Sequence, residues 1–183
     1  MQRKIRLALA LAAAAAATAA QAHNVWLKPS STVLSKSEWV TVDAAVSNDL
    51  FFFNHRPLAI EQLVITAPDG SKLVPVNASK GELRTTFDFK PEQPGTYQLA
   101  IVSGGVNGMF KDAAGQPKRV RGTADEVQKQ IPADATDVRI SEGYSRIETY
   151  VTVGKPTAVK PSGKGLELVP VTHFNDLVAG EEA

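Results

Sequence analysis

The sequence predicts an all-β protein with the architecture of an antiparallel β-sandwich, and three observations support this prediction. Many short segments alternate between apolar and polar residues, with the period of two that is typical of a half-buried strand. Turn-forming Pro, Gly and Asp residues separate these segments, as they do in sandwiches. Only one stretch, 123–132, has residues that would begin and end a helix.

The predicted strands follow one another along most of the chain. Six segments have the strand pattern: 38–46, 62–67, 82–89, 91–102, 144–153 and 165–171. The residues expected to share apolar faces are Val40, Val42, Ala44 and Val46, then Leu83, Thr85, Phe87 and Phe89, then Tyr97, Leu99 and Ile101, and finally Ile147, Thr149, Val151 and Val153. A Pro-Asp-Gly turn follows the second segment. The fourth begins with the corner PGTYQLAI, which resembles the start of a late strand in immunoglobulin-like domains, so we expect an immunoglobulin-like sandwich.

A polar segment rich in Gly, Lys and Asp, about residues 104–143, interrupts the strands. We expect it to form an irregular insertion at one end of the sandwich. The helix predicted within it has Thr123 as its cap, Asp125 and Glu126 in its first turn, and Pro132 as its stop.

Residues 1–22 have the features of a secretory signal peptide. The segment starts with basic residues, continues as the apolar block 7–20 and ends on the small-x-small sequence 20–22. The block is too short for a membrane span, which takes about 20 apolar residues. The alternative is a buried Ala-rich helix, but no partner helix follows. We therefore expect cleavage before His23 and a soluble periplasmic domain covering 23–183.

Composition excludes several classes of function. Without the leader, 17 basic and 19 acidic residues remain, a net charge of −2 with no basic cluster, which argues against nucleic acid as a partner. The chain has no cysteine, so thiolate metal sites, Fe–S clusters, cysteine nucleophiles and a lipoprotein anchor are excluded. No G-x-S-x-G elbow of a serine hydrolase occurs.

His23 would offer two nitrogen ligands if it became the first residue of the mature chain. Its free α-amine and its imidazole can close a chelate ring on one metal ion. Both groups lose their protons readily, because their ordinary pKa values are about 7.7–8.0 and about 6.5, and metal binding uses the deprotonated forms. Alternatively, the histidine simply happens to follow the cleavage point.

The other two histidines of the chain lie at or beyond the ends of predicted strands. His55 follows three phenylalanines in the segment FFFNHRPL, and His173 follows the last predicted strand, with Asp176 three residues later. Loops gather at the two ends of a sandwich, so these residues and His23 could converge on one metal ion. Nitrogen ligands suit Cu(II), Ni(II), Co(II) or Zn(II). The alternative is that His55 and His173 are ordinary surface residues.

The chain also resembles a known bacterial family, the exported NikM-like domain-of-unknown-function proteins described as periplasmic components of cobalt/nickel transport. The resemblance rests on AHNVWLKPS after the leader, on PGTYQLAI, and on GLELVPVTHFNDLVAGE near the end. The matching residues are Ala22, His23, Trp26, Leu166, Glu167, Val169, Pro170, Asp176, Leu177 and Gly180. The resemblance implies a periplasmic immunoglobulin-like domain that handles a transition metal, but it fixes neither the metal nor the ligands. Members of this family usually continue into a second small β-domain, which we expect this chain to lack.

Three functions follow as hypotheses. The leading one is a non-enzymatic domain that binds or delivers nickel, cobalt or copper, with a membrane metal-transport permease as its partner. The second is an oxidative copper enzyme with a histidine brace, and the third is a metal-free structural or adhesion sandwich. Placing the three histidines separates the third from the others, and an assay for peroxide formation with copper and a reductant separates the first two.

Overall fold

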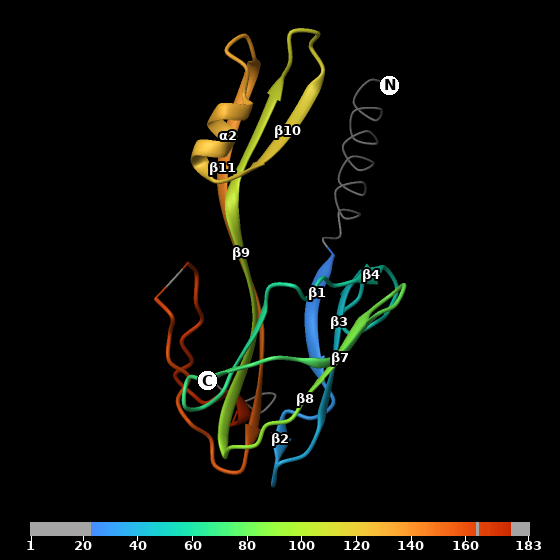
Figure 1. Ribbon diagram of the computed structural model, residues 1–183, viewed down its shortest axis with the longest axis vertical. Helices are drawn as coiled ribbons and strands as arrows, with labels where there is room; N and C mark the ends of the chain where they lie inside the picture. Colours follow the sequence, from blue (N-terminus) through green and yellow to red (C-terminus); the bar gives the residue numbers. More distant parts are fainter. Residues whose placement is uncertain (1–22, 164, 177–183) are drawn as a thin grey trace, which may run out of the picture.

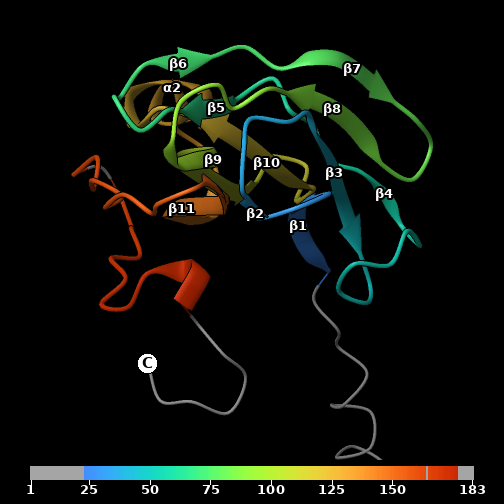
Figure 2. The ribbon, with the colours of Figure 1, turned by 90° about the horizontal axis from the view of Figure 1, so that it is seen from below.

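The computed structural model of the protein describes residues 23–163 and 165–176 and consists of two β-sheets that face each other (Figures 1 and 2). The first sheet contains β1 (Asn24–Pro29), β3 (Val40–Ser47), β8 (Thr85–Phe89) and β7 (Val76–Lys80), in that order, with β4 (Arg56–Pro57) also paired to β3. The second contains β2 (Val33–Leu34), β11 (Thr136–Val153), β9 (Gly95–Lys111), β5 (Leu63–Thr66) and β6 (Lys72–Leu73), with β10 (Pro117–Gly122) also paired to β9. The predicted all-β sandwich is confirmed.

The core lies between the sheets and includes most residues of the faces predicted from the alternation, although Leu83 is 44% exposed. Val40, Val42, Ala44, Phe87 and Leu99 are completely buried. Their neighbours in the strands point away from the core because successive side chains of a strand alternate between its two faces. In the middle of β11 the pattern is weaker, since residues 146–149 are all half-buried.

The pairing is antiparallel except at one edge. β1 runs antiparallel to β3, and β11 runs antiparallel to β9 over the whole length of both strands. The short strand β2 instead pairs in parallel with the end of β11, at Val33–Thr152 and Leu34–Val153. The segment between β1 and β3 therefore crosses from one sheet to the other and joins them.

The insertion forms an arm that projects from the sandwich (Figure 1). β9 and β11 continue past the core into it, β10 pairs with β9, and helix α2 (Ala124–Gln130) follows β10. The predicted helix is confirmed together with its cap, because Thr123 Oγ1 accepts from Glu126 N and the Glu126 carboxylate accepts from Thr123 N. The segment around the helix is more regular than expected, since strands occupy most of it.

Helix α2 packs closely on the arm because of one glycine. A Cβ atom at Gly108 would lie 2.9 Å from Val120 Cγ2, 2.9 Å from Val127 Cγ1 and 3.2 Å from Ile131 Cδ1. Val127 is the buried residue of the helix and is completely covered. The glycine thus leaves the space that Val127 fills.

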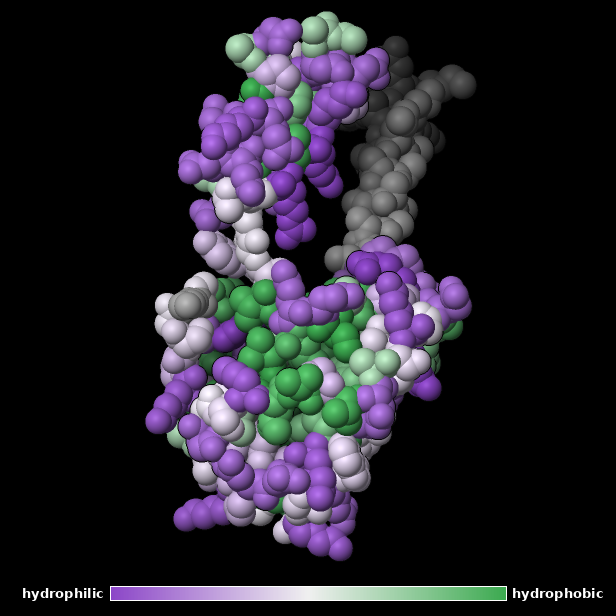
Figure 3. Space-filling view, viewed as in Figure 1, coloured by the Kyte–Doolittle hydropathy of each residue, from purple (hydrophilic) through white to green (hydrophobic). Residues whose placement is uncertain are grey.

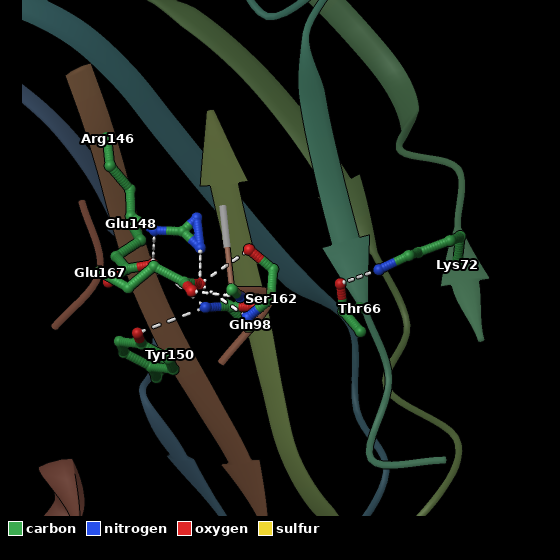
Figure 4. A network of polar contacts seen from close by, with 9 residues as sticks. Thr66, Lys72, Gln98, Arg146, Glu148, Tyr150, Ser162 and Glu167 are labelled. Carbon is green, nitrogen blue, oxygen red and sulfur yellow. Dashed lines mark hydrogen bonds and ion pairs between the residues drawn. The ribbon is translucent and has the colours of Figure 1, made fainter. Parts of the chain in front are cut away.

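The strand predicted for 165–171 does not form. This segment belongs to the tail that follows β11 and lies along the second sheet, ending in the 3-10 helix η1 (Phe174–Asp176). Its conformation is set instead by Glu167, whose carboxylate accepts from Ser162 N (2.8 Å), Ser162 Oγ (2.9 Å) and Gly163 N (2.6 Å) (Figure 4). Arg146 on β11 binds the same carboxylate at 2.6 Å and so attaches the tail to the sheet. These hydrogen bonds fold the chain back between Ser162 and Glu167, so the segment does not pair with either sheet.

The predicted leader, residues 1–22, lies outside the described residues. Within the part of the chain that the structure describes, no helix has both the length and the apolar character needed to cross a membrane.

Candidate functional site

His23 and His55 lie side by side at one end of the first sheet. Their ring centroids are 4.0 Å apart and their planes differ by 24°, so the two imidazoles are stacked. Both side chains are exposed to solvent. The structure therefore brings together two of the four predicted ligands.

Strand β3 places these two residues. His23 immediately precedes β1, whose Asn24 pairs with Ser47, and His55 immediately precedes β4, whose Arg56 pairs with Val46. β1 and β4 therefore meet the same end of β3 at neighbouring positions. The two histidines are brought to the same level of the sheet by backbone pairing.

Hydrogen bonds hold the loop between β3 and His55. Asn54 Oδ1 accepts from Asn48 N at 2.9 Å, and Asn54 Nδ2 donates to Asp49 Oδ2 at 3.1 Å. Ser47 Oγ donates to the Asp49 carbonyl at 2.6 Å. Asn54, the residue before His55, is thus fixed at both ends of its side-chain amide.

An aromatic cluster beneath the loop supports it further. Phe51 and Phe53 each pack on Trp26 of β1 with ring centroids 5.4 Å apart. Trp26 is buried, and its Nε1 donates to Ser47 Oγ at 2.8 Å. Phe51 has a positive φ of 66°, which turns the chain so that two of the three consecutive phenylalanines can contact Trp26. The phenylalanines that precede His55 in the sequence therefore anchor its loop on β1.

The surroundings of His55 favour its neutral form. Its pKa is lowered from the ordinary value by partial desolvation, and further by the positive charges of His23 and Arg56. A neutral imidazole is the form that binds metal ions. His55 thus keeps a free nitrogen lone pair at lower pH than an isolated histidine would.

His173 and Asp176 lie elsewhere. His173 Nε2 is 3.0 Å from Thr96 Oγ1 at the start of β9, and His173 Nδ1 accepts from Asn175 N at 3.2 Å, so the ring makes hydrogen bonds at both nitrogens. Thr96 pairs with Thr152 on β11, whereas the start of β1 borders β11 near Arg146. These positions are six residues apart on β11, about 20 Å. The predicted convergence of three histidines does not occur.

Asp176 is part of the same remote tail. Its backbone N–H donates to the His173 carbonyl at 2.8 Å in η1, and its side chain is exposed. The neighbouring Phe174 stacks on Tyr150 with ring centroids 3.9 Å apart. His173 and Phe174 therefore help to dock the tail on the second sheet, whereas Asp176 bonds only within the tail.

The described residues contain no group of three or more His, Cys, Asp and Glu side chains that could hold a metal ion. The side chains of His23 and His55 would offer two imidazole ligands to a metal ion, and the α-amine of a processed His23 would offer a third. An open groove of about 640 Å³ lies between β1 and β11, and its lining includes Val25, Leu50 and Leu168 but neither histidine.

A family model described as "Domain of unknown function (DUF4198)" matches residues 20–183. The chain belongs to this family. No curated protein and no solved structure gives a match to it. The DUF4198 match begins next to His23 and includes both sheets, the arm and the tail.

Sequence reasoning missed two features of this DUF4198 domain. One is the cluster of Arg146, Glu148 and Glu167, in which Arg146 Nε lies 3.1 Å from Glu148 Oε2 and all three side chains are nearly buried. The alternation of charge in the segment SRIET was a signal for it. The other is a pair of arginines on the arm, Arg119 and Arg121 of β10. Their spacing of two residues in KRVRG indicates a strand that presents both on one face.

Proposed function

We propose that the mature protein is a periplasmic domain that binds and delivers a transition metal, with His23 and His55 as its protein ligands. The observation that carries this proposal is the stacked pair itself. With metal–nitrogen bonds of about 2 Å, two imidazoles bound next to each other on one ion have centroids about 4–5 Å apart. The observed 4.0 Å matches this separation, and rotation of the two exposed side chains, whose rings now stack face to face, would turn one nitrogen of each toward a shared ion.

The third ligand is the α-amine of His23, released when residues 1–22 are removed. Amine and imidazole nitrogens favour Ni(II), Co(II), Cu(II) or Zn(II) over Mg(II) and Ca(II), which prefer oxygen. Three protein ligands leave a coordination position open. An ion held at an exposed edge with an open position can pass to another protein, which suits delivery better than storage.

The resemblance to NikM-like proteins supports nickel or cobalt as the cargo and a membrane metal-transport permease as the recipient. The domain would then have no catalytic activity of its own. The lowered pKa of His55 favours metal binding, because at a mildly acidic pH fewer protons compete with the metal for its imidazole.

The decisive experiment compares the protein that starts at His23 with one that carries a single additional alanine before it. The extension keeps every side chain but converts the amine of His23 into an amide, which keeps its proton and does not bind Co(II) or Zn(II) at neutral pH. We expect it to weaken binding of Co(II) or Zn(II) by at least about tenfold, as severely as His55→Ala does. Isothermal titration with each metal measures this, with His173→Gln as the control that keeps its affinity.

Three outcomes would contradict the proposal. Equal metal affinity of the extended and mature proteins would exclude the amine as a ligand. No binding of any of the four metals would favour a metal-free structural or adhesion sandwich. Peroxide formation by the copper-loaded protein with a reductant would favour the histidine-brace enzyme. Under the proposal, affinity also falls as the pH drops through the range in which amine and imidazole become protonated.

A further inference from the structure

The arm has two faces, and only one of them is covered. Val120, Gly108 and Ile140 form one cross-strand row, and this row faces α2. The neighbouring rows point to the opposite side because side chains alternate along a strand. These uncovered rows are Arg119–Met109–Arg139 and Arg121–Asn107–Ser141.

Three arginines give the uncovered face a strong positive charge. Arg119, Arg121 and Arg139 are all exposed, and we call them the arginine face. Arg119 extends over its neighbour, with Nη2 3.8 Å from Met109 Sδ. Among the described residues, none of the three forms an ion pair with a carboxylate.

None of the six acidic residues within 104–143 forms an ion pair with these arginines. Asp112 pairs with Lys118 at 3.4 Å, and Asp137 pairs with Lys111 at 2.6 Å. The hydrogen bond from Lys111, and to a lesser extent the charge of Arg139, lower the pKa of Asp137. The arginine face therefore has no ion-pair partner among the carboxylates of the arm.

The arginine face is turned toward the side of the molecule where β1 begins. Tyr97, Leu99 and Ile101 of β9 point into the core, toward the first sheet. Asn107 and Met109 lie an even number of residues further along β9, so they are on the same face of the strand as these core residues. The uncovered face of the arm therefore continues the side of the second sheet that faces the first sheet. α2 lies on the side of the arm away from β1 (Figures 1 and 2). Hydrophilic side chains project from the arm into the space above the sandwich (Figure 3).

We propose that the arginine face binds an acidic, extended segment of a partner protein. The planar guanidinium matches a carboxylate with two parallel hydrogen bonds. Arg119 and Arg121 are two residues apart on β10, about 7 Å along the strand. An extended segment with an acidic residue at every second position presents carboxylates at the same spacing on one side, so the two patterns are complementary.

The shape of the surface favours a protein segment over other anions. Small ligands bind in concave pockets, whereas the arginines lie on an open strand surface. A flat membrane would contact the tip of the arm before it reached the arginine face, which is turned toward the sandwich. An extended segment bound to the arginine face would lie on the side of the arm where the metal is proposed to bind.

The test uses the mature protein without metal, so its result is independent of the metal proposal. The probe is a fluorescein-labelled peptide in which glutamate alternates with serine, and binding is followed by fluorescence anisotropy. The test variant combines Arg119→Gln, Arg121→Gln and Arg139→Gln. The control variant makes the same change in charge on the sandwich, with Lys80→Gln, Lys155→Gln and Lys160→Gln.

We expect the arginine variant to bind the peptide at least about threefold more weakly, because it loses three exposed ion pairs with the glutamates. The control variant should bind almost as tightly as the unchanged protein, and a peptide with glutamine in place of glutamate should not bind. Equal weakening by both variants, or unchanged binding by the arginine variant, would overturn the proposal. So would arginine-dependent binding to phosphatidylglycerol vesicles, or competition by inorganic phosphate at concentrations similar to those of the peptide.

Discussion

Val127 attaches helix α2 to the arm, and its replacement by alanine gives a direct measure of how the arm is held together. The side chain is completely buried against Gly108, so the change removes two methyl groups from a packed site. At about 0.8 kcal/mol for each buried carbon, the loss is about 1.6 kcal/mol. A helix of seven residues is too short to persist without packing. We therefore expect its local opening to become about 15-fold more frequent, since 1.4 kcal/mol corresponds to a factor of ten.

Hydrogen exchange of the α2 amides, followed by mass spectrometry, measures this opening. Val138→Ala is the matched control, because Val138 lies on the same arm but is 45% exposed. The control should change exchange in α2 by less than about twofold. If Val127→Ala left the protection of α2 unchanged, the packing of Val127 on Gly108 would not be what holds the helix.

Two further predictions concern the tail and the helix cap. Hydrogen bonds from Ser162 N, and from other donors that include Arg146, lower the pKa of Glu167 from 4.5 to about 2. The ionised carboxylate therefore stabilises the tail above about pH 4.5, and this stabilisation is lost as the pH falls toward about 2. Glu167→Gln should abolish this pH dependence, measured as proteolysis of the tail by pepsin between about pH 4.5 and about pH 2, and an unchanged profile would contradict the role of the carboxylate. Thr123→Ala removes the acceptor for Glu126 N and should destabilise α2 by about 1 kcal/mol. Exchange of the first-turn amides tests this, and Thr136→Ala, which changes an exposed threonine at the start of β11, is the control.

The elements that could be predicted from sequence are those whose signal is local. Alternation alone identified the buried faces of β3 and β9, because burial on one side of a strand requires an apolar residue at every second position. The capping box of α2 was equally readable, because both of its hydrogen bonds lie within four residues.

The remaining features depend on contacts between distant segments. The apolar residues of 165–171 alternate as in a strand, but Glu167 binds Arg146 of β11 and the backbone at Ser162, and this overrides the pattern. The arm was expected to be irregular because it is polar and contains several glycines. Its strands pair with one another, and α2 covers one of their faces, where Val106, Phe110 and Val127 are buried.

The candidate site was predicted only in part for the same reason. His55 was one of the residues expected to converge on His23, and the structure places the two rings together. The cause is the pairing of a two-residue strand, β4, with β3, which is too short to leave a pattern in the sequence. His173 was expected just beyond a strand, but that strand does not form, and the residue lies on the second sheet instead.

The parallel pairing of β2 with the end of β11 has a consequence for the order of folding. The first sheet uses only segments from the first half of the chain, so its strands can pair early. β2 must wait for a partner that emerges from the ribosome near the end of synthesis. Contacts between such distant segments make folding slow, because a long loop must close before they contribute. An incomplete chain therefore keeps one edge of the sandwich open, and we expect it to remain a substrate for chaperones or proteases until β11 is available.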